Sequence, residues 1–306
     1  MLILVSSALA FAPRGLPLQP ARRASTACMS SDAASAWLPN SLSSIVDGLG
    51  LTEKADYAAD LGCSSFNVGG SSGSIKSYEG PGAPNVAWCS GFQLQGPELT
   101  HSSITVYCGP LSDVPHLIAS SGVSTAGEGA VNLFIDFRVR AECGYTPSGV
   151  YEEPTSREAF AMGGNRKDFA DAFFTEDAIA WRESLLAIPG AEVTMPSEAE
   201  MAEMSASSLY LDLKLPLNKE NAAAAATACE QATARWLGWM QNSEQNKRNL
   251  PAGAKQTGVY QRDTKVRANL YGVMLKRYNA LFGDQGQALT AADVGPLDEA
   301  YVGGGS

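Results

Sequence analysis

The sequence predicts a single α/β domain with the architecture of an α/β/α sandwich, in which helices flank a central antiparallel sheet. Extended segments joined by short turns come first along the chain, and amphipathic helices dominate later, an order typical of helices packed on such a sheet. The chain has 306 residues, 45% hydrophobic and 18% charged, enough to bury one sizeable core. We expect a domain at 32–285, between a presequence at 1–31 and a flexible tail at 286–306.

The presequence has the composition of a targeting segment, with three arginines and no acidic residue. Its apolar run 1–10 is too short to span a bilayer and ends in Ala8-Leu9-Ala10, a pattern that signal peptidase accepts. Phe11-Ala12-Pro13 then leads into an acid-free, Arg- and Ser-containing stretch. The whole resembles the bipartite presequence of algae whose plastid is reached through the endomembrane system, and predicts the chloroplast stroma. A plain secretory signal is the alternative, and it would predict disulfides.

Charge and residue supply argue against two functional classes. The formal net charge is −10, which has the wrong sign for unassisted binding to nucleic acid. The chain contains two histidines, His101 and His116, and its six cysteines include no CxxC pair. We therefore expect no metal cofactor and reduced thiols.

The first elements after the presequence are helical and then irregular. Residues 42–61 carry apolar side chains near helical spacing, broken by Gly48 and Gly50, which predicts a helical hairpin or a kinked helix. Residues 63–84 are rich in Gly and Ser. We expect a loop there, either a flexible surface loop or one that lets the backbone approach a ligand.

Four extended segments follow and predict an antiparallel meander: 85–94, 102–108, 116–119 and 131–140. In the last segment the side chains alternate between two faces. We expect a core face and a polar, accessible face. The core face carries Leu133, Ile135, Phe137 and Val139; the polar face carries Phe134, Asp136, Arg138 and Arg140.

The remaining segments predict helices with one further strand. A helix begins after Thr175, where two acidic residues suit a first turn, and ends before Pro189-Gly190. The strand is expected at 205–215, an Ala-rich helix at 221–241 and a C-terminal helix at about 265–282.

Basic residues are concentrated in one segment of an otherwise acidic chain. Residues 32–306 carry 19 basic and 32 acidic residues, whereas the segment 247–277 contains eight basic residues and one acid. This segment predicts a local positive field for an anionic ligand or an acidic partner. A solvated helix face with distant counter-ions is the alternative.

No local catalytic signature is found, because the sequence lacks a P-loop, GxSxG, HExxH and a Rossmann fingerprint. Two segments resemble the central sheet of red chlorophyll catabolite reductase: Ser112-Asp113-Val114-Pro115-His116-Leu117-Ile118 and Asn132-Leu133-Phe134-Ile135-Asp136-Phe137-Arg138. Later segments keep the family's order over about 200 residues. They are Phe173-Phe174, Arg182-Glu183-Ser184-Leu185-Leu186, Ile188-Pro189, the strand before Ala222, Arg262-Asp263-Thr264-Lys265 and Leu281-Phe282-Gly283.

The resemblance implies a relative of the ferredoxin-dependent bilin reductases. An open-chain tetrapyrrole would bind between the sheet and the C-terminal helices, ferredoxin would supply single electrons without a bound redox cofactor, and side chains would donate protons. The sequence departs from the family where the acids are expected. The acid five positions after Pro115 falls on Ser120, and counting back from Leu281 places the helix aspartate at about Val273.

The remaining acid candidates, taken as catalytic residues, are His116, Asp136 and Asp263, with Asp113 close by. Each has a structural alternative: His116 as a hydrogen-bonded sheet residue, Asp136 as a partner of Arg138 or Arg140, and Asp263 as a helix cap. For substrate binding we expect basic residues to meet the propionates of the pigment and the residues at the replaced acid positions to line its site. The expected substrate-binding residues are Arg138, Arg262, Arg267, Ser120 and Val273.

Two functions follow from the resemblance. One is a ferredoxin-dependent reductase of red chlorophyll catabolite or a related bilin. The other is a non-catalytic pigment-binding protein associated with photosynthetic complexes, which the loss of the family acids favours. Reduced ferredoxin and a linear tetrapyrrole are the expected partners. A homodimer and a peripheral contact with the thylakoid or a photosystem stay open.

Overall fold

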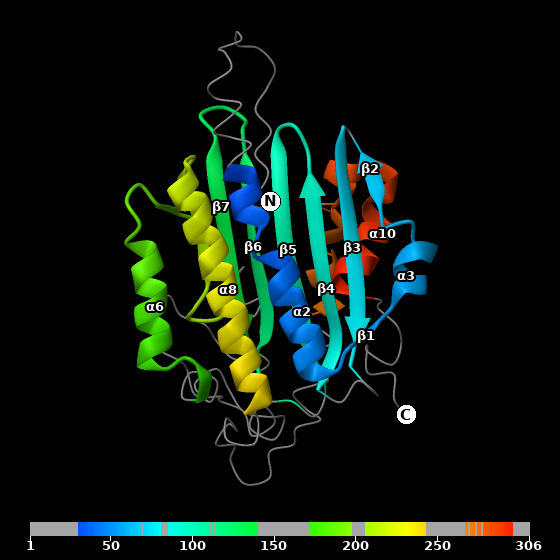
Figure 1. The fold of residues 1–306 in the computed structure, drawn as a ribbon, viewed down its shortest axis with the longest axis horizontal. Coiled ribbons are helices and arrows are strands. Elements are labelled where there is room, and N and C mark those ends of the chain that lie inside the picture. Colours follow the sequence, from blue (N-terminus) through cyan, green and yellow to red (C-terminus); the bar gives the residue numbers. More distant parts are fainter. Residues whose placement is uncertain are drawn as a thin grey trace.

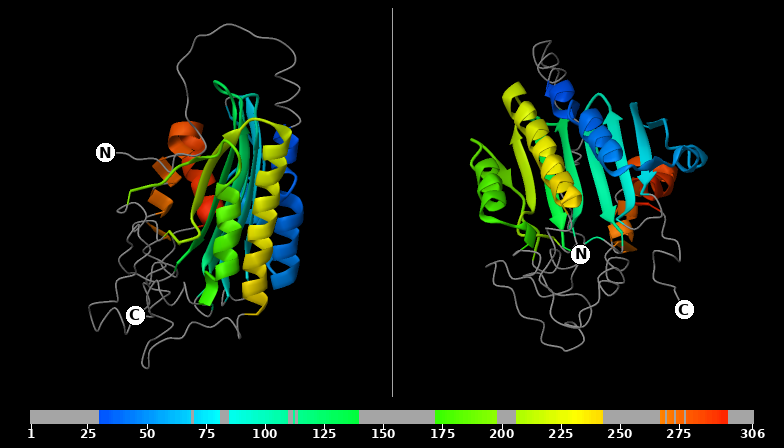
Figure 2. Two further views of the ribbon diagram at one scale, coloured as in Figure 1. Left: turned by 90° about the vertical axis from the view of Figure 1, so that its left-hand side faces the viewer. Right: turned by 60° about the horizontal axis from the view of Figure 1, so that its bottom comes forward.

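A computed structural model describes residues 30–295, with gaps at 69, 81–84, 110–111, 113, 140–171, 198–205, 243–266, 269, 273 and 277. It has three layers: a large twisted sheet, helices on one face, and a C-terminal helical segment on the other (Figures 1 and 2). The predicted α/β/α sandwich with an antiparallel sheet is confirmed.

The described sheet has nine strands, and every pairing is antiparallel. Their order is β1-β3-β4-β5-β6-β7-β9-β8, with β2 paired to β3. The strands are β1 (Thr52–Glu53), β2 (Phe66–Val68), β3 (Ser71–Glu79), β4 (Val86–Gln95), β5 (Leu99–Cys108), β6 (His116–Ser124), β7 (Ala130–Arg138), β8 (Glu192–Val193) and β9 (Leu211–Pro216).

The meander prediction is confirmed by β4 to β7, which pair consecutively. The predicted loop over 63–84 is wrong, because it contains β2 and β3. Gly and Ser disfavour a strand in isolation, but β3 pairs with β4 over seven residues, and this pairing outweighs local preference. Gly73 has a steric role there, since a Cβ at this position would lie 2.4 Å from Cζ of Phe66.

Three helices cover one face of the sheet: α2 (Leu38–Leu49), α6 (Glu176–Leu186) and α8 (Lys219–Gln241). Helix α8 is capped by Asn218, whose side chain accepts a hydrogen bond from the backbone N–H of Asn221 at 2.7 Å. These helices and the core face of β7 form the largest buried cluster of the described residues. The predicted alternation in β7 is thus confirmed for its core face, whereas the face expected to be accessible is buried too.

Residues 42–61 do not form one kinked helix. Helix α2 ends at Gly50, which adopts a left-handed backbone with φ of 61°, as helix C-caps commonly do. Strand β1 separates α2 from a short helix, α3 (Ala55–Asp60), at the edge of the sheet (Figure 1).

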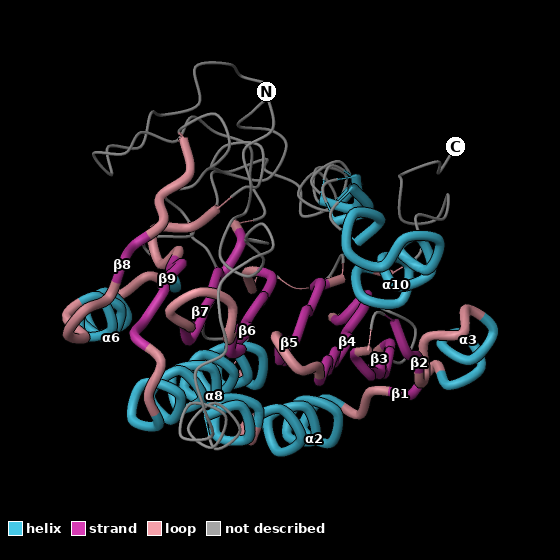
Figure 3. The backbone as a smooth tube through the Cα atoms, turned by 90° about the horizontal axis from the view of Figure 1, so that it is seen from above, coloured by secondary structure: helices cyan, strands magenta, loops and turns pink. Residues whose placement is uncertain are grey.

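The opposite face carries the C-terminal segment, as the view along the strands shows (Figure 3). Described residues of 267–282 are helical, a short 3-10 turn η1 (Gly283–Gln285) follows, and α10 (Gly286–Val294) completes the segment. The expected flexible tail is therefore wrong for 286–294. Leu289, Ala292 and Val294 are buried, and this burial against the sheet holds a nine-residue helix that would be marginal alone.

Gly122 of β6 lies at a close approach between β5 and β6. A Cβ there would lie 2.2 Å from the carbonyl oxygen of Thr100 in β5, so Gly122→Ala should lower the free energy of unfolding by about 1–3 kcal/mol. Gly238 in α8 is the matched control, because its Cβ would meet no atom within 4 Å. Ala there should instead raise stability by about 0.5–1 kcal/mol. Urea unfolding measures both, and equal effects would contradict the steric argument.

Candidate functional site

A cleft lies between the sheet and the C-terminal segment, where the resemblance placed a ligand. The space between its atoms amounts to about 800 Å³, with the solvent at its open mouth included. The lining is mainly apolar, and Arg138 and Asp293 bring charge to it. The lining residues are Phe92, Leu94, Leu99, His101, Ser103, Thr105, Ile118, Ser120, Phe134, Arg138, Leu270, Met274, Tyr278, Leu281, Phe282, Asp293 and Val294.

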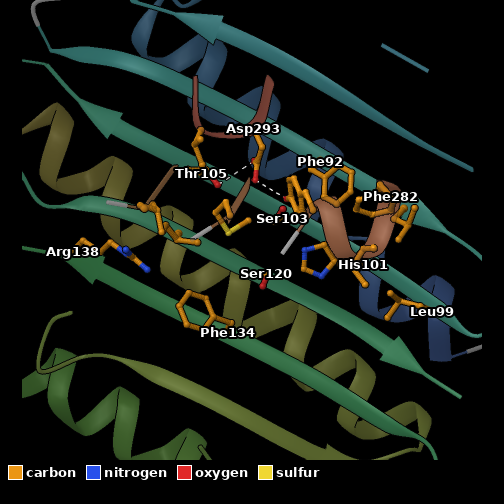
Figure 4. Close-up of a pocket in the computed structure, with 17 residues that line it drawn as sticks. Phe92, Leu99, His101, Ser103, Thr105, Ser120, Phe134, Arg138, Phe282 and Asp293 are labelled. Atoms are coloured by element: carbon orange, nitrogen blue, oxygen red, sulfur yellow. Dashed lines mark hydrogen bonds between the residues drawn. The ribbon is translucent and has the colours of Figure 1, made fainter. Parts of the chain in front are cut away.

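The floor of the cleft is a row of four residues across the central strands. Phe92 of β4 pairs with Ser103 of β5, Ser103 with Ser120 of β6, and Ser120 with Phe134 of β7. Two hydroxyls therefore stand between two aromatic rings (Figure 4). Both residues line the cleft, so their hydroxyls can donate hydrogen bonds to a ligand or accept them from it.

Ser120, one of the expected ligand contacts, lines the cleft, and the strand register explains why. Successive side chains alternate between faces, so His116, Ile118 and Ser120 of β6 share the cleft side. Val273, the other replaced position, lies outside the described residues, and so do Arg262 and Asp263.

Asp293 at the end of α10 is a site residue that the sequence did not indicate. It is 3% exposed and lines the cleft. Its Oδ2 accepts a hydrogen bond from the Tyr278 hydroxyl at 2.8 Å, and its Oδ1 lies 2.8 Å from the Ser90 hydroxyl. Thr105 lies farther away, with Oγ1 at 3.4 Å from Oδ1. The sequence signal for this site would have been an amphipathic helix at 286–294, with the apolar Leu289 and Ala292 on one side.

The contacts of the Ser90 hydroxyl are relevant to the protonation state of Asp293. The Ser90 hydroxyl lies 2.8 Å from both the backbone carbonyl oxygen and Oδ1 of Asp293. A hydroxyl carries one proton, so it can donate to one of these acceptors at a time. When Ser90 donates to the carbonyl, a proton on Oδ1 can satisfy the second contact by donating to Ser90. These contacts can therefore accommodate Asp293 either as a neutral acid or as a carboxylate.

Arg138 forms the cationic end of the cleft, opposite Leu99 and His101 (Figure 4). Its side chain is 2% exposed, and its Nε lies 3.5 Å from Oδ2 of Asp136. Of the two structural alternatives for Asp136, the contact with Arg138 is observed, and Arg140 lies outside the described residues. Asp136 itself is fully buried and is not among the lining residues.

His116 also lies behind the lining. Its Nδ1 accepts a hydrogen bond from the backbone N–H of Cys108 at 3.0 Å, and its ring meets the Tyr107 ring edge-on at 5.1 Å. This is the hydrogen-bonded sheet residue of the structural alternative. Burial raises the pKa of the Tyr107 hydroxyl to about 12, so the phenol keeps its proton at neutral pH.

Arg267 is placed differently from the predicted carboxylate clamp. Its Nε and one terminal nitrogen donate to the carbonyl oxygen of Val294 at 3.1 and 3.0 Å, and its guanidinium lies 5.0 Å from the centre of the Tyr107 ring. It is 4% exposed and absent from the lining. Arg267 therefore joins the C-terminal helical residues to the end of α10.

Two further expectations can be compared with the described residues. The cysteines among them, Cys63, Cys89, Cys108 and Cys229, are free and buried, consistent with reduced thiols. Burial raises the pKa of Cys63 to about 11, which disfavours its reactive thiolate form.

The described residues contain no cluster of three or more His, Cys, Asp or Glu side chains that could hold a metal ion. None of the helices in the described part of the chain has the length and hydropathy of a membrane span.

Comparisons with known proteins reveal a relationship in fold. No family model matches the sequence, and no curated protein matches it. Among solved structures, the chain is similar to phytochromobilin synthase from tomato in complex with biliverdin, with a TM-score of 0.56. The match has 10% sequence identity and covers 85% of this chain and 83% of the tomato chain. At that identity the likeness shows a shared fold, and it extends over most of both molecules.

Proposed function

We propose that the protein binds an open-chain tetrapyrrole in the cleft and reduces it with electrons from ferredoxin. The observation that carries the proposal is the cleft itself: an apolar lining, a buried cation at one end, and a buried carboxyl group in its wall. The fold supports it as well, since the similar tomato protein was crystallised with biliverdin.

The lining suits the chemistry of such a pigment. A linear tetrapyrrole offers flat apolar rings, polar N–H and C=O groups along one edge, and carboxylate side chains. Phe92 and Phe134 can contact the rings, and the hydroxyls of Ser103 and Ser120 can bond to the polar groups. Arg138 can receive a carboxylate through a charge-assisted hydrogen bond.

The reaction needs electrons and protons in equal number. Two reduced ferredoxins each deliver one electron, two protons are added, and one carbon–carbon double bond of the pigment becomes a single bond. The pigment itself accepts the electrons, so the chain must position it and deliver protons to it. We assign one of the two protons to Asp293, the carboxyl group that lines the cleft and can be held as a neutral acid, and the other to solvent water at the open mouth of the cleft.

The test is an anaerobic assay of the unmutated protein with reduced ferredoxin, followed by absorbance. Biliverdin and red chlorophyll catabolite are offered separately, because they distinguish a bilin substrate from a chlorophyll-derived one. We expect a shift of the absorbance band that requires both protein and reduced ferredoxin. Absence of any product with either pigment would contradict the reductase.

A non-catalytic pigment carrier is the second candidate, and one observation favours it. Ser120 stands on the cleft floor where the related reductases are expected to have an acid, and a serine hydroxyl is a poor proton donor. The carrier predicts tight binding of the pigment without reduction. Binding titrations run beside the assay therefore separate the two functions.

We propose the plastid stroma as the location, on the sequence of residues 1–31. These lie outside the described residues, except for 30 and 31. In a reporter fusion, Phe11→Ala should divert the protein to the secretory route, because the aromatic residue at the junction is the expected import signal. Microscopy of the fusion measures this, and unchanged plastid import would contradict the role of Phe11.

A further inference from the structure

We infer that Asp136 is a positioning residue that holds Arg138 in place to receive a carboxylate of the ligand. The inference rests on the proposed function, and it defines the substrate class further: a tetrapyrrole that carries a free carboxylate at the Arg138 end of the cleft. It also replaces the proton-donor role expected for Asp136 from the sequence.

The two oxygens of Asp136 have separate partners. Oδ1 accepts hydrogen bonds from both the backbone N–H and the hydroxyl of Ser207, at 3.0 and 2.8 Å. Oδ2 faces Nε of Arg138 at 3.5 Å. Ser207 therefore fixes the carboxyl group on one side, and the carboxyl group directs the guanidinium on the other.

The segment that carries Ser207 is itself held by contacts of the described residues 206–210. The Ser207 hydroxyl also accepts a hydrogen bond from the backbone N–H of Leu209 at 3.1 Å, and Tyr210 packs edge-on against Phe134 with ring centres 5.4 Å apart. Ala206 and Tyr210 are buried with Phe134 in one cluster. The segment that holds Asp136 through Ser207 therefore also packs against Phe134 on the cleft floor.

Strand geometry explains why one residue can orient the other. Asp136 and Arg138 are two residues apart in β7, so their side chains leave the same face of the sheet. Asp136 is 0% and Arg138 2% exposed, and a buried guanidinium without a counter-charge is strongly disfavoured. Arg138 lines the cleft and Asp136 does not, so the carboxylate acts through the arginine.

The geometry is unsuited to proton donation by Asp136. A general acid must come within hydrogen-bond reach of the reacting atom, about 3 Å. Asp136 lies outside the lining, with its two oxygens directed at Ser207 and Arg138.

The experiment compares biliverdin with its dimethyl ester, which has the same ring system without free carboxylates. Equilibrium titration by absorbance gives the affinity of both pigments for the unmutated protein, Asp136→Asn, Arg138→Gln and the double variant. The unmutated protein should bind the diacid about tenfold or more tightly than the ester. Either single variant should abolish most of that preference, and the double variant should remove no more, because both residues serve one contact.

Two further variants keep the result interpretable. Ser207→Ala retains both charges and removes one support of Asp136, so it should lower the diacid preference by a smaller factor. It decides the question if Asp136→Asn fails to fold. Asp47→Asn, an exposed acid in α2 on the other face of the sheet, controls for loss of one negative charge and should leave the preference unchanged.

The outcomes separate the inference from the proposed function. If the unmutated protein binds neither pigment, the tetrapyrrole function fails. If it binds both pigments equally, or if Asp136→Asn and Ser207→Ala keep the full diacid preference, the positioning role is overturned. Loss of reduction in Asp136→Asn with an unchanged diacid preference would instead identify Asp136 as the acid.

Discussion

Asp293→Asn should lower the rate of tetrapyrrole reduction by about a hundredfold or more, the usual loss when a general acid is removed. Asparagine has nearly the same shape and still offers an oxygen to the surrounding hydroxyls, but it cannot release a proton. Pigment affinity should stay close to that of the unmutated protein. Single turnover with reduced ferredoxin measures the rate, and absorbance titration measures the affinity.

The control for this prediction is Tyr278→Phe, which removes one hydrogen bond to Asp293 and retains its carboxyl group. It should lower the rate far less than Asp293→Asn. Electron paramagnetic resonance adds a second readout, because a one-electron-reduced pigment that receives no proton should accumulate as a radical. Full activity in Asp293→Asn would place the proton donor elsewhere, and equal losses in both variants would indicate a structural effect.

Arg267→Ala should lower the free energy of unfolding by about 3 kcal/mol, because it leaves the buried carbonyl of Val294 without two hydrogen bonds and removes a cation–π contact with Tyr107. Since Val294 ends α10 and lines the cleft, pigment binding should weaken too. The loss should be equal for biliverdin and its dimethyl ester, because Arg267 does not face the ligand. Urea unfolding and pigment titration measure the two effects.

Lys276→Ala is the matched control, an exposed cation in the same helical stretch, and it should change neither quantity appreciably. If Arg267 instead bound a carboxylate of the pigment, as the sequence analysis expected, the opposite result would follow. A selective loss of affinity for the diacid, with stability unchanged in Arg267→Ala, would restore that clamp and refute the structural role.

Taken together, these variants divide the cleft into separate roles. Asp293→Asn should affect rate, Arg138→Gln should affect the preference for a free carboxylate, and Arg267→Ala should affect folding and both pigments equally. Each role follows from the contacts of a single side chain. The sequence had grouped Arg138 with Arg267 as ligand contacts, and the structure separates them, because one lines the cleft and the other is directed at the end of α10.

The sequence by itself determined the layered fold and one side of the site. Alternation in β7 assigned Arg138 and Phe134 to the face opposite the core, because strand period is a local property of a chain. Ser120 was located through the family resemblance, by counting from Pro115. Helix α6 likewise follows from the acidic residues of its first turn, although the Thr175 side chain makes no capping hydrogen bond, and α8 follows from its apolar spacing.

Tertiary structure decided the rest, because the remaining signals depend on pairing between distant segments. β3 exists through its ladder with β4 despite its Gly and Ser content, and α10 exists through burial of Leu289 and Ala292 against the sheet. Asp293 could be recognised as a site residue only from the position of α10 against the sheet, because its hydrogen-bond partners lie up to 203 residues away in the sequence. For Asp136, local alternation correctly predicted which face of the sheet its side chain is on. Its role could not be predicted in this way, because it depends on contacts with the distant Ser207 and with the buried Arg138.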